Sequence, residues 1–191
     1  KKLFENLKKY KWQNILEKEN IVGLKRNKQR ITTEPGLQCE LSGEPLDNIH
    51  QVCSESSNYL KEITEASVGL NIQTVSVGFD PFNKVSEIPK NPKERYEIMT
   101  NEMPKGGSSS LDMMYRTCGI QINYDYISEK NFEKIFRIGN YLTPLTIAIF
   151  ANSPFENKKP TGNLSYRNKV WQKTARGGIM PIAFENITFE K

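Results

Sequence analysis

A chain of 191 residues, 37% hydrophobic and 26% charged, is long enough to bury a core and fits one globular domain or slightly more. Its formal net charge of +5 is spread along the chain without a run of like charge, which argues against a nucleic-acid-binding tail. The longest apolar stretch, LTPLTIAIFA at 142–151, is too short to span a bilayer and contains Pro144, so we expect neither a membrane segment nor a signal peptide.

The first half of the chain alternates between helical and strand periodicity. In chain order we expect a helix at 3–18, a hairpin of strands 21–26 and 30–33, a strand at 34–43, a helix at 47–68 capped by Asp47, and a strand at 71–79. A proline-punctuated loop follows.

The second half predicts a helix at 95–103, a flexible connection through GGSSS, a strand at 115–126, a helix at 128–151 and one or two helical turns at 165–172. The helix opened by Ser128 is expected to turn five apolar residues inward, namely Phe132, Ile135, Phe136, Ile138 and Leu142. Strands joined by hairpins and by helices of different lengths predict an α+β fold with a mainly antiparallel sheet, while an α/β arrangement stays open.

The sequence has three cysteines, Cys39, Cys53 and Cys118, and one histidine, His50. No pair of cysteines has C-x-x-C spacing, so we expect neither a disulfide framework nor a zinc site, and a reducing cytoplasm fits best. The chain begins with Lys1 instead of methionine and ends on FEK, so we expect a fragment of a longer protein, as a single partial domain over 1–191.

Two of the expected strands have an unusually polar second face. In the strand at 34–43, Leu37, Cys39 and Leu41 face the core, and the other face carries Glu34, Gln38, Glu40 and Ser42. In the strand at 118–126, the polar face carries Gln121, Asn123 and Asp125. A solvated sheet face would satisfy either pattern alone. Together the two strands predict a polar floor within one sheet.

Strand spacing decides which of these side chains can meet. Residues two apart on a strand lie roughly 6.6 Å apart and neighbouring strands about 4.8 Å apart, so Gln38, Glu40, Gln121 and Asn123 can surround one or two ions bridged by phosphate. A straight strand would hold Glu34 about 20 Å from Glu40. A bend at Pro35–Gly36 would bring it closer, so Glu34 is a secondary candidate. Oxygen ligands without histidine or thiolate favour magnesium.

Three arginines are candidates for holding carboxylate or phosphate groups. Arg116 precedes the second polar strand, and Arg167 and Arg176 flank Trp171. Arginine binds such anions through two parallel hydrogen bonds. For any one of them a solvated side chain or a surface ion pair is the simpler interpretation, although Arg116 stands at the mouth of the predicted floor.

Three stretches carry a resemblance to a known family: EPGLQCELSGEPL (34–46), ERYEIMTNEMPKGGSSSLDMMYRTCGIQINYDY (94–126) and ANSPFENKKPTGNLSYRNKVW (151–171). They closely resemble the glutamate–cysteine ligases of plants and proteobacteria, whose patterns are EPGGQFELSG, RYDIMxxYMPKxGxxGLDMMxRTCTVQVN and ANSPFxxGKPxGxLSxRSxIW. The resemblance runs from about Val22 to the last residue and follows the family's order.

This resemblance implies a glutamine-synthetase-like fold and the ATP- and Mg²⁺-dependent ligation of L-glutamate to L-cysteine, the first step of glutathione synthesis. The small molecules L-glutamate, L-cysteine and ATP would be the partners, without nucleic acid or membrane. The resemblance implies a metal-binding role for Glu40 and Gln121, while Glu34 remains the secondary metal candidate from the strand pattern. It implies substrate or ATP contacts for Asn123, Tyr166 and Arg176, and catalytic roles for Arg116 and Arg167. Gln38 is a candidate substrate or ATP contact from the strand pattern.

The chain departs from the family pattern in several places. We expect the family's first strand, with its E-x-E motif, and the part that follows FEK to lie outside this chain. Leu37 and Cys39 stand where the family usually has glycine and phenylalanine, and the segment around Arg176 is about two residues shorter than the family's. A carboxylate–amine ligase with another amine, an inactive fragment, and a nucleic-acid-binding module remain alternatives, the last without a motif.

Overall fold

The structure is a computed structural model of the chain, and it describes residues 1–174. The contacts between its residues divide the chain into two compact units. Unit 1 holds residues 1–76 and 88–99, and unit 2 holds residues 77–87 and the described residues from 100 onward. Each unit is described by itself below.

Unit 1 is built on a four-stranded antiparallel sheet in the order β1-β2-β3-β4. Its elements are α1 (Lys2–Leu7), a 3₁₀ turn (Lys8–Tyr10), β1 (Gln13–Glu17), β2 (Asn20–Arg26), β3 (Gln29–Thr33), β4 (Cys39–Ser42) and α2 (Ile49–Ser67). The expected hairpin is confirmed as β2 and β3, which turn at Asn27–Lys28, and the expected strand after it is confirmed in its second half as β4.

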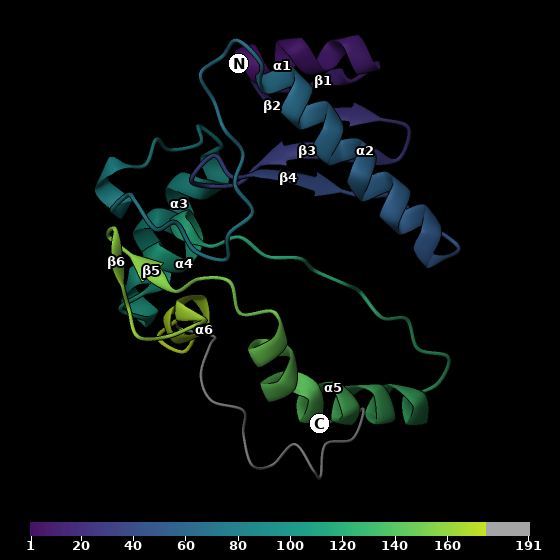
Figure 1. The fold of residues 1–191 in the computed structure, drawn as a ribbon, viewed down its shortest axis with the longest axis vertical. Helices are drawn as coiled ribbons and strands as arrows, with labels where there is room; N and C mark the ends of the chain where they lie inside the picture. Colours follow the sequence, from purple (N-terminus) through teal and green to yellow (C-terminus); the bar gives the residue numbers. More distant parts are fainter. Residues whose placement is uncertain (175–191) are drawn as a thin grey trace. The chain divides into compact units, whose positions relative to one another are not determined.

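The core of unit 1 lies between the sheet and the helix α2, which runs across it (Figure 1). Seven residues form this core. Helix α1, the segment that follows it, the strands β2 and β3 and the helix α2 contribute them: Phe4, Leu7, Trp12, Leu24, Ile31, Ile63 and Ala66. Arg26 reinforces the packing, because its guanidinium lies 4.2 Å from the centre of the Trp12 ring and its Nη1 donates to Glu62 Oε1 at 2.7 Å. The helix predicted at 47–68 is therefore confirmed, with Asn48 as the N-cap in place of Asp47.

Two predictions for this half of the chain are wrong. The first helix ends within the first ten residues, and the rest of the stretch predicted as helix forms β1. Lys11 adopts a left-handed φ of 68°, which stops the helix, and residues 13–17 then pair with β2. The strand expected at 71–79 does not form, since Phe79 makes a single bridge to Thr117 and the residues before it have no ladder partner among those described.

In chain order the later elements are α3 (Glu94–Glu102), which begins in unit 1, and then, in unit 2, α4 (Ser110–Arg116), α5 (Glu129–Ile149), β5 (Phe155–Glu156), β6 (Lys159–Pro160) and α6 (Tyr166–Trp171). Three of these confirm predicted helices, namely α3, α5 and α6. The connection expected to be flexible is shorter than predicted, because α4 begins at Ser110. The mixture of helices with antiparallel strands confirms the α+β class.

The prediction of a strand at residues 115–126 is wrong. Helix α4 continues through Arg116, and residues 118–126 have no strand partner in the described part of the chain. Ile120, Ile122 and Tyr124, which alternate with the polar residues of this stretch, are 94%, 66% and 72% exposed. Alternation of apolar and polar residues alone does not make a strand without a neighbour to complete its hydrogen bonds.

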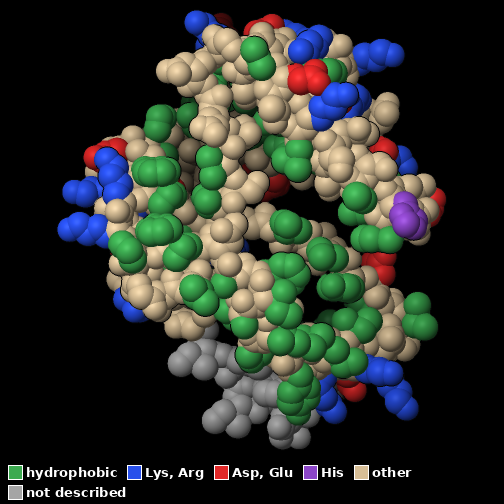
Figure 2. Space-filling model, viewed as in Figure 1, with side chains coloured by type: hydrophobic (Ala, Val, Ile, Leu, Met, Phe, Trp, Pro, Cys, Tyr) green, Lys and Arg blue, Asp and Glu red, His purple; other side chains and the backbone are tan. Residues whose placement is uncertain are grey.

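Helix α5 forms as predicted, but it buries none of its side chains against described residues. The five side chains expected to point inward are half-buried or exposed, with Ile138 and Leu142 46% and 45% exposed. Figure 2 shows hydrophobic side chains gathered over the part of the molecule where Figure 1 places α5. The helix is long, and Ser128 caps it by accepting from the Asn131 N–H. No helix among residues 1–174 is long and apolar enough to cross a membrane.

A small backbone frame organises the rest of unit 2. The Cys118 N–H donates to the Gly78 carbonyl oxygen at 3.2 Å, and the Gly78 N–H donates to the Asn152 carbonyl oxygen at 2.9 Å. The Tyr166 N–H donates to the Ser153 carbonyl oxygen at 3.0 Å. Three segments far apart in the sequence are thereby fixed beside the start of α6.

Candidate functional site

The turn at residues 34–38 and the strand β4 carry the first group of candidate residues. The Glu34 N–H donates to the Gln38 carbonyl oxygen, and the Leu37 N–H donates to the Glu34 carbonyl oxygen, each at 2.9 Å. Gln38 Oε1 accepts from the Gly36 N–H at 2.8 Å. Leu37 has a left-handed φ of 63° and is 43% exposed, so the prediction of Leu37 as a core strand residue is wrong.

A buried asparagine, missed in the sequence, holds this turn in place. Asn91 Nδ2 donates to the Thr33 carbonyl oxygen at 2.6 Å, to Thr33 Oγ1 at 2.9 Å and to the Glu34 carbonyl oxygen at 3.2 Å. The Asn91 N–H donates to the Pro35 carbonyl oxygen at 2.9 Å. The loop before α3 is in this way fastened to the end of β3 and the beginning of the turn.

Three residues around the start of α3 contact Glu34 or its neighbours, and they were not assigned a role from sequence. The Tyr96 hydroxyl donates to Glu34 Oε1 at 3.3 Å and accepts from Arg95 Nη2 at 2.8 Å. Lys93 Nζ donates to the Thr33 carbonyl oxygen at 3.0 Å and lies 5.1 Å from the centre of the Tyr96 ring. The RYEIM stretch was a usable signal, because it is part of the family motif.

The charged side chains near Glu34 and Glu40 shift one another's pKa values. Partial burial raises the pKa of the Glu40 carboxyl, and the negative charge of Glu34 raises it further. A hydrogen bond with Ser42 lowers it, as do Lys93 and Arg95, but by less. Burial lowers the pKa of Lys93. The Glu34 and Glu40 carboxylates are therefore electrostatically coupled, while the role of Glu34 as a secondary metal ligand stays a prediction.

Two carboxylates under mutual repulsion provide some of the hard oxygen ligands that Mg²⁺ takes. Within residues 1–174, no three His, Cys, Asp or Glu side chains are gathered as a metal-binding group. Glu34 and Glu40 by themselves do not form a complete protein cage, and their roles as metal ligands stay predictions.

Gln121 and Asn123 belong to unit 2, whereas Glu40 belongs to unit 1. Gln121 Nε2 donates to Asn123 Oδ1 at 3.1 Å, and both side chains are exposed. Because residues 118–126 are not a strand, the shared sheet face that was to unite these residues with Glu40 is absent from the described structure. Their metal and nucleotide roles stay predictions.

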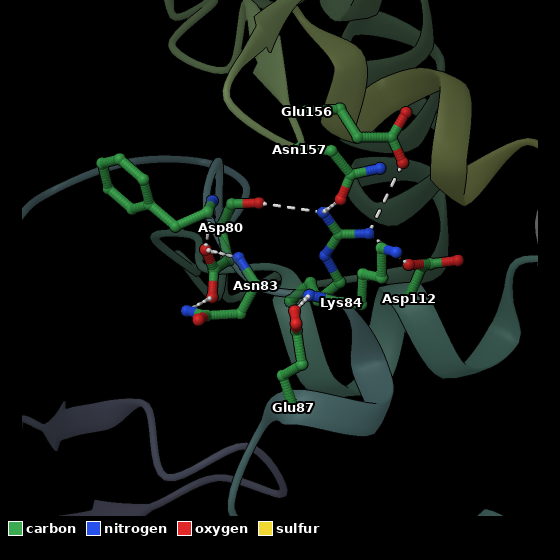
Figure 3. Close-up of polar contacts among 9 residues, drawn as sticks. Asp80, Asn83, Lys84, Glu87, Asp112, Glu156 and Asn157 are labelled. Atoms are coloured by element: carbon green, nitrogen blue, oxygen red, sulfur yellow. Dashed lines mark hydrogen bonds and ion pairs between the residues drawn. The ribbon is translucent and has the colours of Figure 1, made fainter.

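Arg116 is buried, at 4% exposed, and is more enclosed than Arg167. Its Nη1 donates to Asp112 Oδ1 at 2.8 Å and to Glu156 Oε1 at 3.4 Å. Its Nη2 donates to the Asp80 carbonyl oxygen at 3.2 Å and to Asn157 Oδ1 at 3.4 Å (Figure 3). Two carboxylates compensate its charge, so Arg116 ties α4 to the β5–β6 hairpin.

Arg167 follows Tyr166 in the backbone frame described above, and its electrostatic surroundings differ from those of Arg116. Burial lowers its pKa, and the nearby Cys118 opposes that shift. No carboxylate lies within ion-pair distance of its guanidinium among residues 1–174, and its buried Nε has no hydrogen-bond partner there. A half-buried, uncompensated guanidinium is suited to receive an anion.

Tyr166 packs edge to face on Phe79, with ring centres 5.1 Å apart. Burial raises the pKa of Tyr166 to about 12, and its hydrogen bond to Glu156 contributes. The phenol therefore keeps its proton at neutral pH and links α6 to the hairpin. Arg176, the remaining candidate, lies outside the described residues.

Comparison with known proteins places these residues in a family. Curated relatives include glutamate–cysteine ligase A, chloroplastic, of Oryza sativa subsp. japonica, which is 46% identical over 180 residues. The chloroplastic glutamate–cysteine ligases of Nicotiana tabacum and Arabidopsis thaliana are 44% and 43% identical over the same length.

In each comparison the match covers 93% of this chain but 34–37% of the relative. The chain thus spans little more than a third of the length of these relatives. The sequence also matches glutamate-cysteine ligase family 2 (GCS2) over residues 6–188, which is nearly its whole length. The chain belongs to the glutamate-cysteine ligase family 2.

Proposed function

We propose that the protein from which this chain comes is an ATP- and Mg²⁺-dependent glutamate–cysteine ligase, which forms γ-glutamylcysteine in the first step of glutathione biosynthesis. The observation that carries the proposal is the 46% identity to a protein named glutamate–cysteine ligase over 93% of the chain. A glutamine-synthetase-like fold, in which both units belong to one partial catalytic domain, is part of the same proposal.

The chemistry of the reaction matches the residue types present. The side-chain carboxylate of glutamate is a poor electrophile, so it is first phosphorylated by ATP, and the amine of cysteine then displaces phosphate from the acyl phosphate. Mg²⁺, when bound, neutralises charge on the phosphoryl group. Positioning and electrostatic stabilisation dominate such transfers, and no protein nucleophile is needed.

Glu40 and Glu34 are the proposed metal ligands in unit 1, with Gln121 as a further ligand and Gln38 as a substrate contact. The electrostatic coupling of Glu34 with Glu40 supports this assignment, because a cation between two repelling carboxylates lowers their energy. The contacts of Asn91 and Tyr96 would hold Glu34 in position.

In unit 2 the two arginines receive different roles. Arg167 is proposed to contact the carboxylate or phosphate group of a substrate, since no described carboxylate compensates it. Arg116 is engaged by Asp112 and Glu156, which favours a positioning role for it over direct contact. Contacts of Tyr166, Asn123 and Arg176 with substrate or ATP complete the proposal.

The compartment is proposed from the sequence alone. Three cysteines without motif spacing fit a reducing, cytoplasmic setting. The plant relatives carry the word chloroplastic in their names. We propose L-glutamate, L-cysteine and ATP as the partners, without nucleic acid or membrane.

The test is phosphate release by the full-length protein with ATP and Mg²⁺, with formation of γ-glutamylcysteine followed by mass spectrometry. We expect turnover when glutamate and cysteine are both present, and a loss of at least about tenfold in Glu40→Gln and Arg167→Ala. Glu19→Gln, an exposed acid in the β1–β2 turn, is the matched control and should leave turnover unchanged. Equal turnover with another amino acid in place of cysteine would contradict the proposed amine. Turnover without glutamate would contradict the reaction itself.

A further inference from the structure

The guanidinium of Arg167 lies directly against the backbone of Gly119. A β-carbon built on Gly119 would lie 2.9 Å from Arg167 Nη2, 3.4 Å from its Cζ and 3.7 Å from its Nε. Carbon–nitrogen contacts shorter than about 3.0 Å are strongly repulsive, because well-packed heavy atoms sit about 3.5–4.0 Å apart. Any residue other than glycine at position 119 would therefore displace the tip of Arg167.

Other contacts of Arg167 also restrict the position of its guanidinium. The Arg167 N–H donates to Ser153 Oγ at 3.1 Å, which fixes the backbone end of the residue. Its Cδ would lie 3.5 Å from a β-carbon on Gly78, and its Cζ lies 5.3 Å from the centre of the Trp171 ring. The charged end is thus bounded by the Trp171 ring and by the bare backbone of Gly119.

The role of Gly119 is steric, because its φ is outside the left-handed range in which only glycine is comfortable. The family pattern RTCTVQVN has threonine where this chain has Gly119. The packing of the guanidinium on bare backbone is consequently a feature of this chain and does not follow from the family motif.

We infer that Gly119 is a positioning residue that sets where the Arg167 guanidinium receives the carboxylate or phosphate group of a substrate. The inference rests on the proposed function, in which Arg167 contacts that anion. Two-pronged recognition of an anion requires the plane and position of the guanidinium to be fixed, so displacing its tip weakens both hydrogen bonds at once.

The test is a double-mutant cycle in the full-length protein, with Gly119→Ala made in the wild-type and in the Arg167→Ala background. We expect Gly119→Ala to raise KM for glutamate or for ATP about tenfold while kcat changes less than about twofold. In the Arg167→Ala background the same substitution should change neither constant. The matched control is Gly139→Ala, since a β-carbon there meets no atom within 4 Å.

An unchanged KM in Gly119→Ala would overturn the inference. An equal effect in both backgrounds would overturn it too, because a merely structural role of Gly119 does not depend on Arg167. These results would leave the proposed ligase function standing, as long as the wild-type protein ligates glutamate to cysteine.

If the wild-type protein lacks that activity, the proposed function fails and the inference is still tested by anion binding. Titration with inorganic phosphate should change the fluorescence of Trp171, because its ring lies beside the guanidinium. The change should vanish in Trp171→Phe, and Gly119→Ala should weaken phosphate binding about fivefold or more relative to Gly139→Ala. Equal binding by the two variants, or no response of the wild-type protein, overturns the inference.

Discussion

Asn91 Nδ2 donates to the Thr33 carbonyl oxygen at 2.6 Å, across 58 positions of sequence. With the accompanying bonds to Thr33 Oγ1 and to the Glu34 carbonyl oxygen, this contact sets the position of the turn that carries Glu34. One buried amide therefore connects the loop before α3 with the candidate metal ligands.

Asn91→Ala should be among the most destabilising polar substitutions in unit 1. It removes the hydrogen bonds that the buried Nδ2 donates to Thr33 and Glu34, which predicts a loss of about 1–2 kcal/mol in the free energy of unfolding. The loss stays moderate because Lys93 Nζ and the Leu37 N–H still donate to the Thr33 and Glu34 carbonyl oxygens. Urea denaturation measures it, with Asn58→Ala on the exposed side of α2 as the control. Similar losses for the two variants would show that the hydrogen bonds of Asn91 contribute little.

Leu37→Gly should stabilise the protein. Leu37 has a φ of 63°, a conformation that costs a residue with a β-carbon about 1–2 kcal/mol and glycine very little. Loss of its partly exposed side chain and the greater freedom of glycine in the unfolded chain offset part of the gain, so we expect about +0.5–1 kcal/mol.

The control for this substitution is Leu60→Gly on α2, where the leucine is 54% exposed and the backbone is helical. That change should destabilise by about 1 kcal/mol, since glycine is a poor helix former. The two variants should thus shift the denaturation midpoint in opposite directions. A shift in the same direction would count against strain at position 37.

Lys158→Gly should stabilise the β5–β6 hairpin. Asn157 and Lys158 form its two-residue loop and have φ values of 48° and 66°, the pattern of a type I′ turn, in which Asn-Gly is the favoured pair. The family pattern has glycine here as well. We expect slower amide hydrogen exchange in the hairpin, by a factor of about 3–5, corresponding to a gain of about 0.6–1 kcal/mol. Lys159→Gly, one residue later within β6, should speed the exchange.

Glu40→Gln should stabilise unit 1 at neutral pH, at the expense of the proposed metal site. An acid whose pKa is raised by folding binds its proton more tightly in the folded chain, so its contribution to the free energy of unfolding falls as pH rises from the unfolded to the folded pKa. The difference in stability between Glu40→Gln and wild type should therefore grow between pH 4 and pH 7.

Denaturation midpoints at several pH values check this prediction, and Glu19→Gln supplies the same chemical change at an exposed turn position. A pH-independent difference for Glu40→Gln would show that Glu34 and burial do not strain the Glu40 carboxyl.

The elements that were predicted correctly have strong local signals. Helix α2 has an N-cap and a long amphipathic pattern, and the β2–β3 hairpin has its polar turn at Asn27–Lys28. Capping residues, turn residues and the periodicity of apolar side chains act over short stretches of chain, so a single sequence is enough to identify both elements.

The misassigned elements depend on contacts that local patterns do not contain. Residues 13–17 suit a helix or a strand equally, and pairing with β2 decides for the strand. The alternating residues 118–126 have no strand partner in residues 1–174. A pattern of two-residue period shows what a strand would bury, but it does not supply the neighbouring strand.

The same limit applies to the candidate site. Glu34 and Glu40 could be proposed from the sequence, whereas the contacts of Asn91 and Tyr96 with Glu34 span 57 and 62 positions of sequence. The left-handed backbone at position 37 is occupied by leucine instead of glycine, so the sequence gives no signal of it. The different charge environments of Arg116 and Arg167 depend on which acids fold beside each of them.

The apolar side of α5, which no side chain of residues 1–174 buries, has a practical consequence for the isolated chain in solution. Side chains such as Leu145, Ile149 and Phe150, at 55%, 64% and 77% exposed, form a surface to which a dye such as anilinonaphthalene sulfonate binds with a rise in emission. Two such helices can pair through the same surface, so light scattering should report an apparent mass that grows with protein concentration. Charged replacements along α5 would keep the preparation monodisperse.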